Sequence, residues 1–287
     1  MGKPLTIATG AEADDLHART RTRPGTPMIG PYSVNQMDDL YTAIPAGEVK
    51  ASGIMNLAQR LYVAERVQQG ARLVDICCGR GLQLPTLYRY APGLQQYVGL
   101  DVAAANLAEA RDRIAQLDDH YGARPFPIEL VECDVAAPWP AEAVGDGFDV
   151  AVYTSALEHL PRELAVASLR HAAAALRPGG VLYLSTPETP GLPPRPLQYR
   201  VHVYEWNSAE LEPVLAACGL VVEEKVGQLS PPADQVAAAL AERFGDGARQ
   251  WYQRLREAVS PALLDTVAAA AIPDAAMEVM YVCRRPA

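Results

Sequence analysis

The sequence has 287 residues, a formal net charge of −9 and an isoelectric point near 5.1. A chain of this length can bury one large core, so we predict a single domain with appended segments. Its negative mean field would repel a polyphosphate backbone, which argues against a nucleic-acid partner.

The cysteines and the apolar segments bear on the compartment. There are five cysteines, two of them adjacent at Cys77 and Cys78, and none belongs to a C-x-x-C pair. This pattern predicts neither a disulfide framework nor a zinc site, and it favours a reducing cytoplasm. No stretch approaches the roughly 18 apolar residues of a membrane helix, and we expect no signal peptide. The prediction is a cytoplasmic protein without a membrane partner.

Composition and periodicity divide the chain into five segments. Residues 1–30 are rich in Thr, Arg, Gly and Pro and are predicted to be flexible. In residues 31–70 the apolar positions are three or four apart, which predicts helices that form part of an active-site cover. Residues 71–228 are predicted to form the core, 229–275 a helical lid inserted into it, and 276–287 the last core strand.

The most informative stretch runs from Leu73 to Leu82 and reads Leu-Val-Asp-Ile-Cys-Cys-Gly-Arg-Gly-Leu. It predicts a buried strand, a tight glycine turn and the start of a helix, which together let the backbone approach a nucleotide-like ligand closely. A dinucleotide fingerprint would need a third glycine where Leu84 stands, and a P-loop would need Lys-Ser or Lys-Thr after the glycines. NAD and ATP are therefore disfavoured.

After this turn, strands and helices alternate. Further strands are predicted at 96–101, 128–134, 148–156 and 181–186, and helices at 82–90, 104–117 and from about 161 to 176. Ser208 is predicted to cap a helix that runs through Cys218. The last two strands, at 220–226 and 277–283, are separated by helical sequence from 233 to 271. This order is typical of an α/β protein.

Three acidic residues stand at the carboxyl ends of successive predicted strands, namely Asp75, Asp101 and Asp134. Ligands of open α/β sheets bind at that edge, and Asp101 lies 20 residues beyond Gly81, where such folds place a carboxylate to bind both ribose hydroxyls. Each acid also has a local alternative. Asp75 could accept from amides of the glycine turn, Asp101 could cap its helix, and Asp134 could be a loop residue. Their concurrence favours a nucleotide-binding role.

Together with the glycine turn, four further stretches resemble the class I S-adenosylmethionine-dependent methyltransferases, from Ala71 to about Gly227. They are Tyr97-Val98-Gly99-Leu100-Asp101-Val102, Glu132-Cys133-Asp134-Val135, Phe148-Asp149-Val150 leading to Leu157-Glu158-His159-Leu160, and Leu176-Arg177-Pro178-Gly179-Gly180-Val181-Leu182 followed by Ser185-Thr186-Pro187. The family usually has glycine where Cys77 stands, so this chain has less room beside the backbone. The small-molecule subgroup, which includes quinone-type and natural-product enzymes, is the most similar.

The resemblance implies an α/β fold with a Rossmann-like, seven-stranded, mostly parallel sheet, an antiparallel closing hairpin and helices on both faces. It implies S-adenosyl-L-methionine as the cofactor, with Asp101 on the ribose, Val102 packed on the adenine and Asp134 on the adenine amino group. The implied cofactor-binding residues are Asp75, Cys77, Gly79, Gly81, Asp101, Val102, Asp134, Val135 and Thr154. No metal is predicted to take part.

Methyl transfer from a sulfonium depends mainly on holding nucleophile, methyl carbon and sulfur in line. A hydroxyl or protonated amine acceptor would also benefit from a general base, for which His159 and His202 are the candidates. The stretch around His202, residues 200–206, is similar to the corresponding part of quinone-type methyltransferases. The alternative for each is a structural histidine satisfied by backbone carbonyls. The predicted substrate contacts are the aromatic residues Tyr41, Tyr199 and Trp251.

The predicted function is methyl transfer to an oxygen, nitrogen or carbon of a small organic molecule, specifically a bacterial secondary metabolite. Two alternatives stay open, a protein or peptide methyltransferase and a regulator that binds the cofactor without transferring methyl. An RNA methyltransferase is disfavoured by the acidic balance. The oligomeric state is open, with a homodimer as one option.

Overall fold

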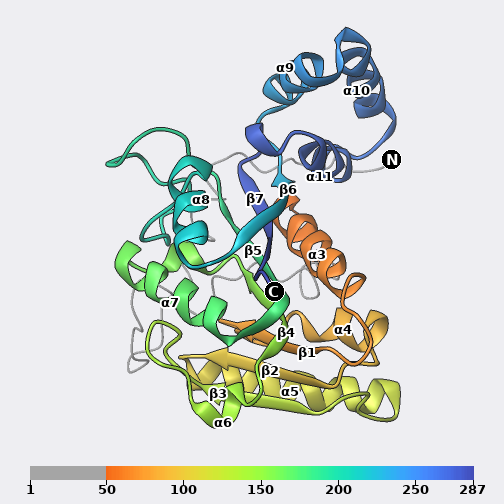
Figure 1. Cartoon of the computed structure of the whole chain (residues 1–287). Coiled ribbons are helices and arrows are strands. Elements are labelled where there is room, and N and C mark those ends of the chain that lie inside the picture. Colours follow the sequence, from red (N-terminus) through yellow and green to blue (C-terminus); the bar gives the residue numbers. More distant parts are fainter. Residues whose placement is uncertain (1–49) are drawn as a thin grey trace, which may run out of the picture. The chain divides into compact units, whose positions relative to one another are not determined.

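A computed structural model describes residues 50–287, and its central element is a seven-stranded sheet (Figure 1). The strand order is β3-β2-β1-β4-β5-β7-β6. The strands are β1 (Arg72–Ile76), β2 (Gln96–Asp101), β3 (Ile128–Glu132), β4 (Phe148–Thr154), β5 (Leu176–Pro187), β6 (Val221–Leu229) and β7 (Glu278–Arg284). Strands β1 to β5 pair in parallel, while β7 runs antiparallel to β5 and β6. The predicted sheet with its antiparallel closing hairpin is confirmed.

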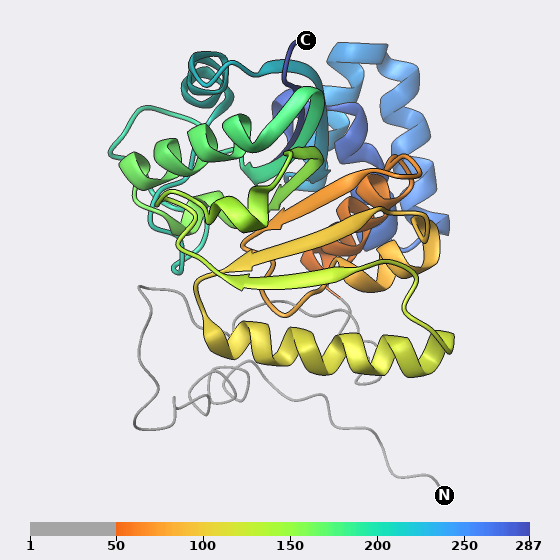
Figure 2. The ribbon, with the colours of Figure 1, turned by 60° about the horizontal axis from the view of Figure 1, so that its bottom comes forward.

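Helices cover both faces of this sheet. They are α3 (Ala51–Ala64), α4 (Leu84–Tyr90), α5 (Ala104–Tyr121), α6 (Ala141–Val144), α7 (Arg162–Ala175), α8 (Ser208–Ala217), α9 (Ala233–Phe244), α10 (Asp246–Ala258) and α11 (Pro261–Ala271), with 3₁₀ turns η2 (Leu157–His159) and η3 (Pro273–Ala275). Apolar residues of α3, α4 and α5 share one core with the sheet, and those of α7 and α8 share another. Figure 2 shows α5 and α7 on opposite sides of the strands.

Side-chain alternation along the strands explains the two cores. In β1, Leu73 packs in the core of α3 to α5, while Val74 and Ile76 pack in the core of α7 and α8. All five residues of β1 are buried, as expected of a parallel strand covered on both faces. Because β1, β2, β4 and β5 are parallel, their carboxyl ends lie at one edge of the sheet, where the residues that follow them can meet.

The strand boundaries agree with the predictions to within a few residues. Strand β3 ends at Glu132 rather than Asp134, and β5 begins at Leu176 rather than Val181. Gly179 and Gly180, which come shortly after the helix predicted to end near residue 176, lie inside β5, and Gly179 has a φ of +81°. A left-handed glycine lets the chain turn there and still continue into the strand.

The predicted cap of α8 is wrong. Asn207 is the N-cap, because its side-chain oxygen accepts from the Glu210 amide at 3.0 Å. Ser208 is bound instead by the Glu188 carboxylate, which accepts from its amide and from its hydroxyl, both at 2.9 Å. A tertiary partner therefore replaces the local capping contact of Ser208.

The structure also bears on the expected cysteine chemistry and on membranes. All five cysteines lie within the described residues and all are free thiols, as predicted. No helix within residues 50–287 has the length and apolar character needed to cross a membrane.

Between β6 and β7 the chain forms α9, α10 and α11, which share a small hydrophobic core of their own. Helix α11 packs on β6 and α3. At the contact with β6, a Cβ on Gly227 would overlap the backbone carbonyl of Ala269 and would lie 2.9 Å from the Ala276 Cβ. The predicted insertion is thus helical. Its role as a lid, and the division into five segments, stay predictions, and residues 1–49 lie outside the described residues.

Candidate functional site

The glycine turn follows β1 at the carboxyl edge of the sheet. Cys77, Gly79 and Gly81 have φ values of +57°, +55° and +69°, all in the left-handed region. A Cβ on Gly81 would lie 2.9 Å from the Leu84 side chain and 3.4 Å from that of Ala110, so this bend requires glycine. Cys77 adopts a conformation in which glycine would be unstrained, at the position where the resembled family has glycine.

Asp101 ends β2 and lies buried beside this turn. Its Oδ2 accepts from the Gly79 amide at 2.8 Å, and its Oδ1 accepts from the Ala103 amide at 2.8 Å and from the Asn106 side chain at 3.0 Å. Burial raises the pKa of Asp101, and these hydrogen bonds oppose the rise. The capping alternative for Asp101 is wrong, because the N-cap of α5 is Ala103, and Asp101 binds the amide of that residue and the side chain of Asn106. A carboxylate has about four acceptor positions, so Oδ2 retains one for a ligand.

Asp75 lies within β1 at 5% exposure, and the Tyr97 hydroxyl of β2 donates to its Oδ2 at 2.7 Å. Burial raises the pKa of Asp75 to about 7, while the Tyr97 hydrogen bond and the charge of Arg60 act in the opposite direction. The sequence suggested amides of the glycine turn as an alternative partner. The donor that the structure places on this carboxyl belongs to the neighbouring strand.

The other predicted cofactor residues differ in exposure. Val102 is 48% exposed, which leaves its side chain available to pack on a ring. The Asp134 carboxylate is exposed, and its Oδ1 accepts from the Ala136 amide at 2.9 Å, in agreement with the loop alternative. Val135 is buried in the core, so a ligand contact there would come from its backbone. Thr154 ends β4, the neighbour of β1, and is half-buried.

These features fit a nucleoside ligand. Two of the three left-handed residues in the turn carry no Cβ, so the backbone can come close to a bound group. Asp101 and Asp134 can each accept from hydroxyl or amino groups, and Val102 offers exposed apolar surface. The assignment of the nine cofactor-binding residues is compatible with this geometry and stays a proposal.

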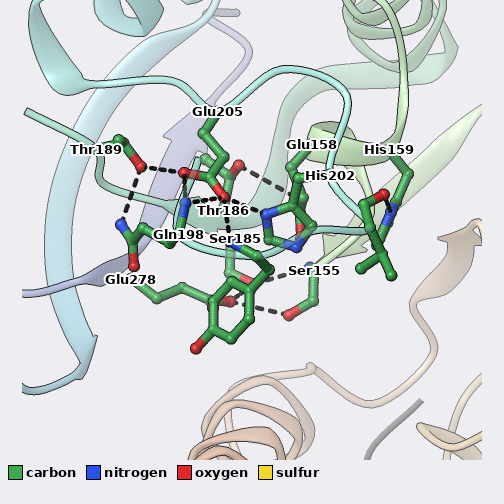
Figure 3. Close-up of polar contacts among 12 residues, drawn as sticks. Ser155, Glu158, His159, Ser185, Thr186, Thr189, Gln198, His202, Glu205 and Glu278 are labelled. Carbon is green, nitrogen blue, oxygen red and sulfur yellow. Dashed lines mark hydrogen bonds and ion pairs between the residues drawn. The ribbon is translucent and has the colours of Figure 1, made fainter. Parts of the chain in front are cut away.

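A second cluster of polar side chains follows β4 and β5 (Figure 3). It contains both predicted catalytic histidines, His159 at the end of η2 and His202 between β5 and α8, with ring centroids 5.1 Å apart. His159 Nδ1 lies 3.3 Å from the Val201 carbonyl oxygen, and His202 Nδ1 lies 2.5 Å from Glu205 Oε1. Burial and the neighbouring His202 lower the pKa of His159 to about 4.

Glu205 organises the loop that carries His202. Its buried carboxylate accepts from the Thr189 hydroxyl at 2.6 Å and from the backbone amides of Gln198 at 2.8 Å and Tyr199 at 3.1 Å. Burial alone would raise the pKa of Glu205, but hydrogen bonds from His202 and from these donors outweigh it and lower the pKa. The ionised carboxylate therefore holds His202 with Nδ1 as the donor.

Two further buried carboxyls complete this cluster. Glu158 Oε1 lies 4.0 Å from His202 Nε2. Glu278, the first residue of β7, accepts from the hydroxyls of Ser155 at 2.9 Å and Ser185 at 3.3 Å. Burial raises the pKa of both glutamates, and the charge of Glu278 adds to the rise at Glu158.

The predicted substrate contacts are placed unequally. The Tyr199 ring lies 5.0 Å from the His202 ring, centroid to centroid, and its residue is 39% exposed. Trp251 is 50% exposed on α10, and within the described residues no ring contact or hydrogen bond joins it to the histidines. Tyr41 lies outside the described residues. Of the two that the structure describes, Tyr199 lies at the histidine cluster and Trp251 does not.

Sequence reasoning assigned no role to the buried glutamates. Glu158 precedes His159 directly, and Glu205 stands three residues after His202, so both had a local signal in stretches already singled out. Glu278 comes from β7 and had no such signal. Its place in the cluster depends on the pairing of β7 with β5, which a local pattern does not specify.

The chain is similar to known methyltransferases. A family model described as a methyltransferase domain matches residues 73–180. The chain is 34% identical over 143 residues to the ubiquinone biosynthesis O-methyltransferase of Xanthomonas campestris pv. campestris (strain B100), a match that covers 49% of this chain and 53% of the relative. The chain thus spans about half the length of the curated relatives it matches.

Two solved structures are similar in fold. The [4+2]-cyclase SpnF has a TM-score of 0.53 at 17% identity, over 82% of each chain. The N-methyltransferase NodS from Bradyrhizobium japonicum WM9, solved in complex with S-adenosyl-L-homocysteine, has a TM-score of 0.52 at 14% identity, over 88% of this chain and 94% of that one. At these identities the likeness concerns the fold alone.

Proposed function

Because the chain belongs to the class I S-adenosylmethionine-dependent methyltransferases, we propose that it transfers the methyl group of S-adenosylmethionine to an oxygen of a small organic molecule. The observation that carries this proposal is the position of the glycine turn and of the glutamate-histidine cluster. They follow neighbouring strands of one sheet edge, β1 on one side and β4 and β5 on the other. When bound, the cofactor supplies a methyl carbon already activated by a positive sulfur.

On the cofactor side, the chain's own residues bind and orient. The Oδ2 of Asp101 would accept from a ribose hydroxyl, Val102 would pack on the adenine, and the exposed carboxylate of Asp134 would accept from its amino group. The turn at Gly79 and Gly81 keeps the backbone close to the bound group. Holding the reacting groups in line can contribute about 7–11 kcal/mol of the barrier.

On the acceptor side, a small hydroxylated molecule is supported by two observations. The curated relatives at about one-third identity are named as ubiquinone biosynthesis O-methyltransferases. In this chain, Tyr199 offers a half-exposed ring beside His202 and the buried carboxyls, so an aromatic or apolar acceptor could pack there with its oxygen toward polar groups. A secondary metabolite of this chemistry is the proposed substrate class.

Calorimetric titration with S-adenosylhomocysteine tests the cofactor site first. We expect saturable binding, no binding of NADH, and an affinity lower by about 1–3 kcal/mol in Asp101→Ala, since one partner of a buried hydrogen-bonded site is lost. Asp112→Ala, an exposed carboxylate on α5, is the matched control and should bind like the parent. Equal binding by Asp101→Ala and Asp112→Ala would remove Asp101 from the site.

A second assay tests the transfer itself. The protein and S-adenosylmethionine are incubated with a panel of catechols, phenols and hydroquinones, and products heavier by one CH₂ are sought by mass spectrometry. A methylated product supports the proposal, and its fragmentation identifies the attacked oxygen. Strong cofactor binding without any product would favour the non-catalytic regulator. Methylation of proteins in place of small molecules would favour a protein methyltransferase.

A further inference from the structure

The strongest unassigned feature is a compact set of ligand-type side chains, Glu158, His159 and His202. Each offers one atom, a carboxylate oxygen or an imidazole nitrogen, and these atoms all lie within 4.8 Å of one another. Glu158 and His159 are adjacent on η2 after β4, and His202 comes from the loop after β5 (Figure 3). The backbone joins the two segments, since the Glu158 carbonyl accepts from the amides of Val203 at 2.8 Å and Tyr204 at 3.1 Å.

The geometry points to a divalent metal site formed by Glu158, His159 and His202, on which the acceptor oxygen binds. Two imidazoles and one carboxylate suit zinc and its neighbours among the divalent transition metals, and three protein ligands leave a position for a substrate oxygen. The sequence predicted no metal, because these ligands form no contiguous motif and come from two separate segments.

Orientation of the histidines supports this assignment. A metal-binding histidine usually donates its second ring N–H to a carboxylate or a backbone carbonyl, which fixes the ring. His202 Nδ1 is placed 2.5 Å from Glu205 Oε1, and His159 Nδ1 is placed 3.3 Å from the Val201 carbonyl oxygen. In both rings the nitrogen on the far side from this acceptor, Nε2, is then the one suited to bind an ion.

Distances and charge agree with a cation at this point. Two ligands bound at about 2.1 Å in tetrahedral geometry lie about 3.4 Å apart, so the 4.0 Å between Glu158 Oε1 and His202 Nε2 requires only a small inward shift. Glu158 and Glu278 are both buried, and no ion pair within residues 50–287 joins either of them to a lysine or arginine. Burial of carboxylates without a cation is costly, and a divalent ion would offset it.

The role of the metal rests on the proposed methyl transfer. A bound cation lowers the pKa of a coordinated hydroxyl, as it lowers the pKa of bound water to about 7 in the best cases. The acceptor hydroxyl would release its proton to water. The resulting oxygen then forms a bond to the methyl carbon while the carbon–sulfur bond breaks and sulfur keeps the electron pair. The histidines would act here as ligands and not as the general base predicted from the sequence.

Metal binding can be tested without any methyl acceptor. Untagged protein is treated with a chelator, dialysed and titrated with Zn²⁺ by calorimetry, and Co²⁺ is added separately to record its visible absorption. We expect one saturable ion per chain and a Co²⁺ spectrum of low coordination number. His202→Ala should abolish both, and Glu205→Gln should weaken binding by about 10- to 100-fold through loss of orientation. His171→Ala, a half-buried histidine outside the cluster, should bind normally.

The outcomes separate the metal site from the proposed function. Absence of saturable Zn²⁺ binding, or unchanged binding by both His202→Ala and Glu205→Gln, overturns the metal site. If Zn²⁺ binds but S-adenosylhomocysteine does not, the metal site stands and the proposed function fails. If both bind, turnover that is lost on chelation and restored by Zn²⁺ supports the catalytic role of the metal. Turnover that the chelator does not change supports the general-base role of the histidines and overturns the catalytic role of the metal.

Discussion

At the scale of single residues, Asp75 is a carboxyl group in the middle of a sheet. Such a group is costly to ionise unless it is paired, and its described hydrogen bond comes from the neutral Tyr97 hydroxyl. Burial therefore raises the pKa of Asp75 to about 7. In the unfolded chain the pKa of an aspartate is about 3.9, so between these values the folded state binds more protons than the unfolded state.

The sign of the pH dependence follows from this difference. The unfolding free energy should fall as the pH rises from about 4 to about 7. Above pH 7 the contribution of Asp75 should be lost completely. The contribution of Asp75 to the unfolding free energy should decrease by about 2–3 kcal/mol between pH 5 and pH 8. Asp75→Asn cannot ionise and still offers Tyr97 an acceptor, so urea unfolding at the two pH values should show this pH dependence reduced by that amount.

Asp112→Asn is the control for this prediction, because its carboxylate is exposed on α5. It should keep the pH dependence of the parent. If Asp75→Asn and Asp112→Asn show the same dependence, Asp75 is ionised in the folded protein at the same pH as in the unfolded chain, and the burial argument fails.

The Asp75 site also shows how far sequence reasoning reaches at this scale. The acid was placed at the carboxyl end of a strand because the apolar residues around it and the glycines after it are local signals. Its partner depends on register, since Asp75 pairs with Gly99 and this brings Tyr97 within reach. Register between parallel strands separated by a helix is set by the packing of the whole sheet.

At the scale of elements, the contact between β6 and α11 is the tightest restraint on the helical insertion. A Cβ on Gly227 would overlap the Ala269 carbonyl, a backbone group that cannot rotate away, and would lie 2.9 Å from the Ala276 Cβ. The helices α9 to α11 otherwise pack largely in their own core. Gly227 therefore determines how closely this insertion approaches the sheet.

Gly227→Ala should move α11 away from β6. Overpacking of this kind costs about 1–3 kcal/mol, so we expect a lower melting temperature and faster hydrogen exchange in residues 233–271, with exchange in α5 nearly unchanged. Gly247→Ala is the matched control, because nothing lies within 4 Å of a Cβ at this position of α10. It should keep or slightly raise the stability, as alanine favours the helix. Equal melting temperatures for the two variants would show that α11 is not restrained at Gly227.

The elements themselves were the best-predicted part of the chain. Strand β2 was predicted with the observed bounds Gln96–Asp101, because its apolar run is bounded by Pro92-Gly93 and by an acid. The N-cap of α8 was not, because Ser208 and Asn207 are both good caps and the choice depends on Glu188 from β5's end, which binds Ser208. Local signals decide that an element exists, and distant residues decide which of two equivalent local contacts forms.

At the scale of the whole molecule, α3 is joined to the functional edge of the sheet through one side chain. Gln59 is buried at 2% exposure, its Oε1 accepts from the Ser185 hydroxyl at 2.7 Å, and its Nε2 donates to the Ser155 hydroxyl at 3.2 Å. The same two hydroxyls lie at the Glu278 carboxylate. A helix from before β1, the ends of β4 and β5 and the start of β7 therefore meet in one hydrogen-bonded network.

Because every member of this network is buried or partly buried, removal of the Gln59 side chain should destabilise all of these elements together. Gln59→Ala leaves the Ser155 and Ser185 hydroxyls without their amide partner, which costs about 1–3 kcal/mol. We expect a lower unfolding free energy in urea and loss of hydrogen-exchange protection in α3 and at the start of β7. Gln116→Ala, an exposed glutamine on α5, removes the same side chain from a helix surface and should change neither. If Gln59→Ala proves as stable as Gln116→Ala, and exchange in α3 and β7 is unaltered, α3 is held to the sheet by its apolar contacts alone.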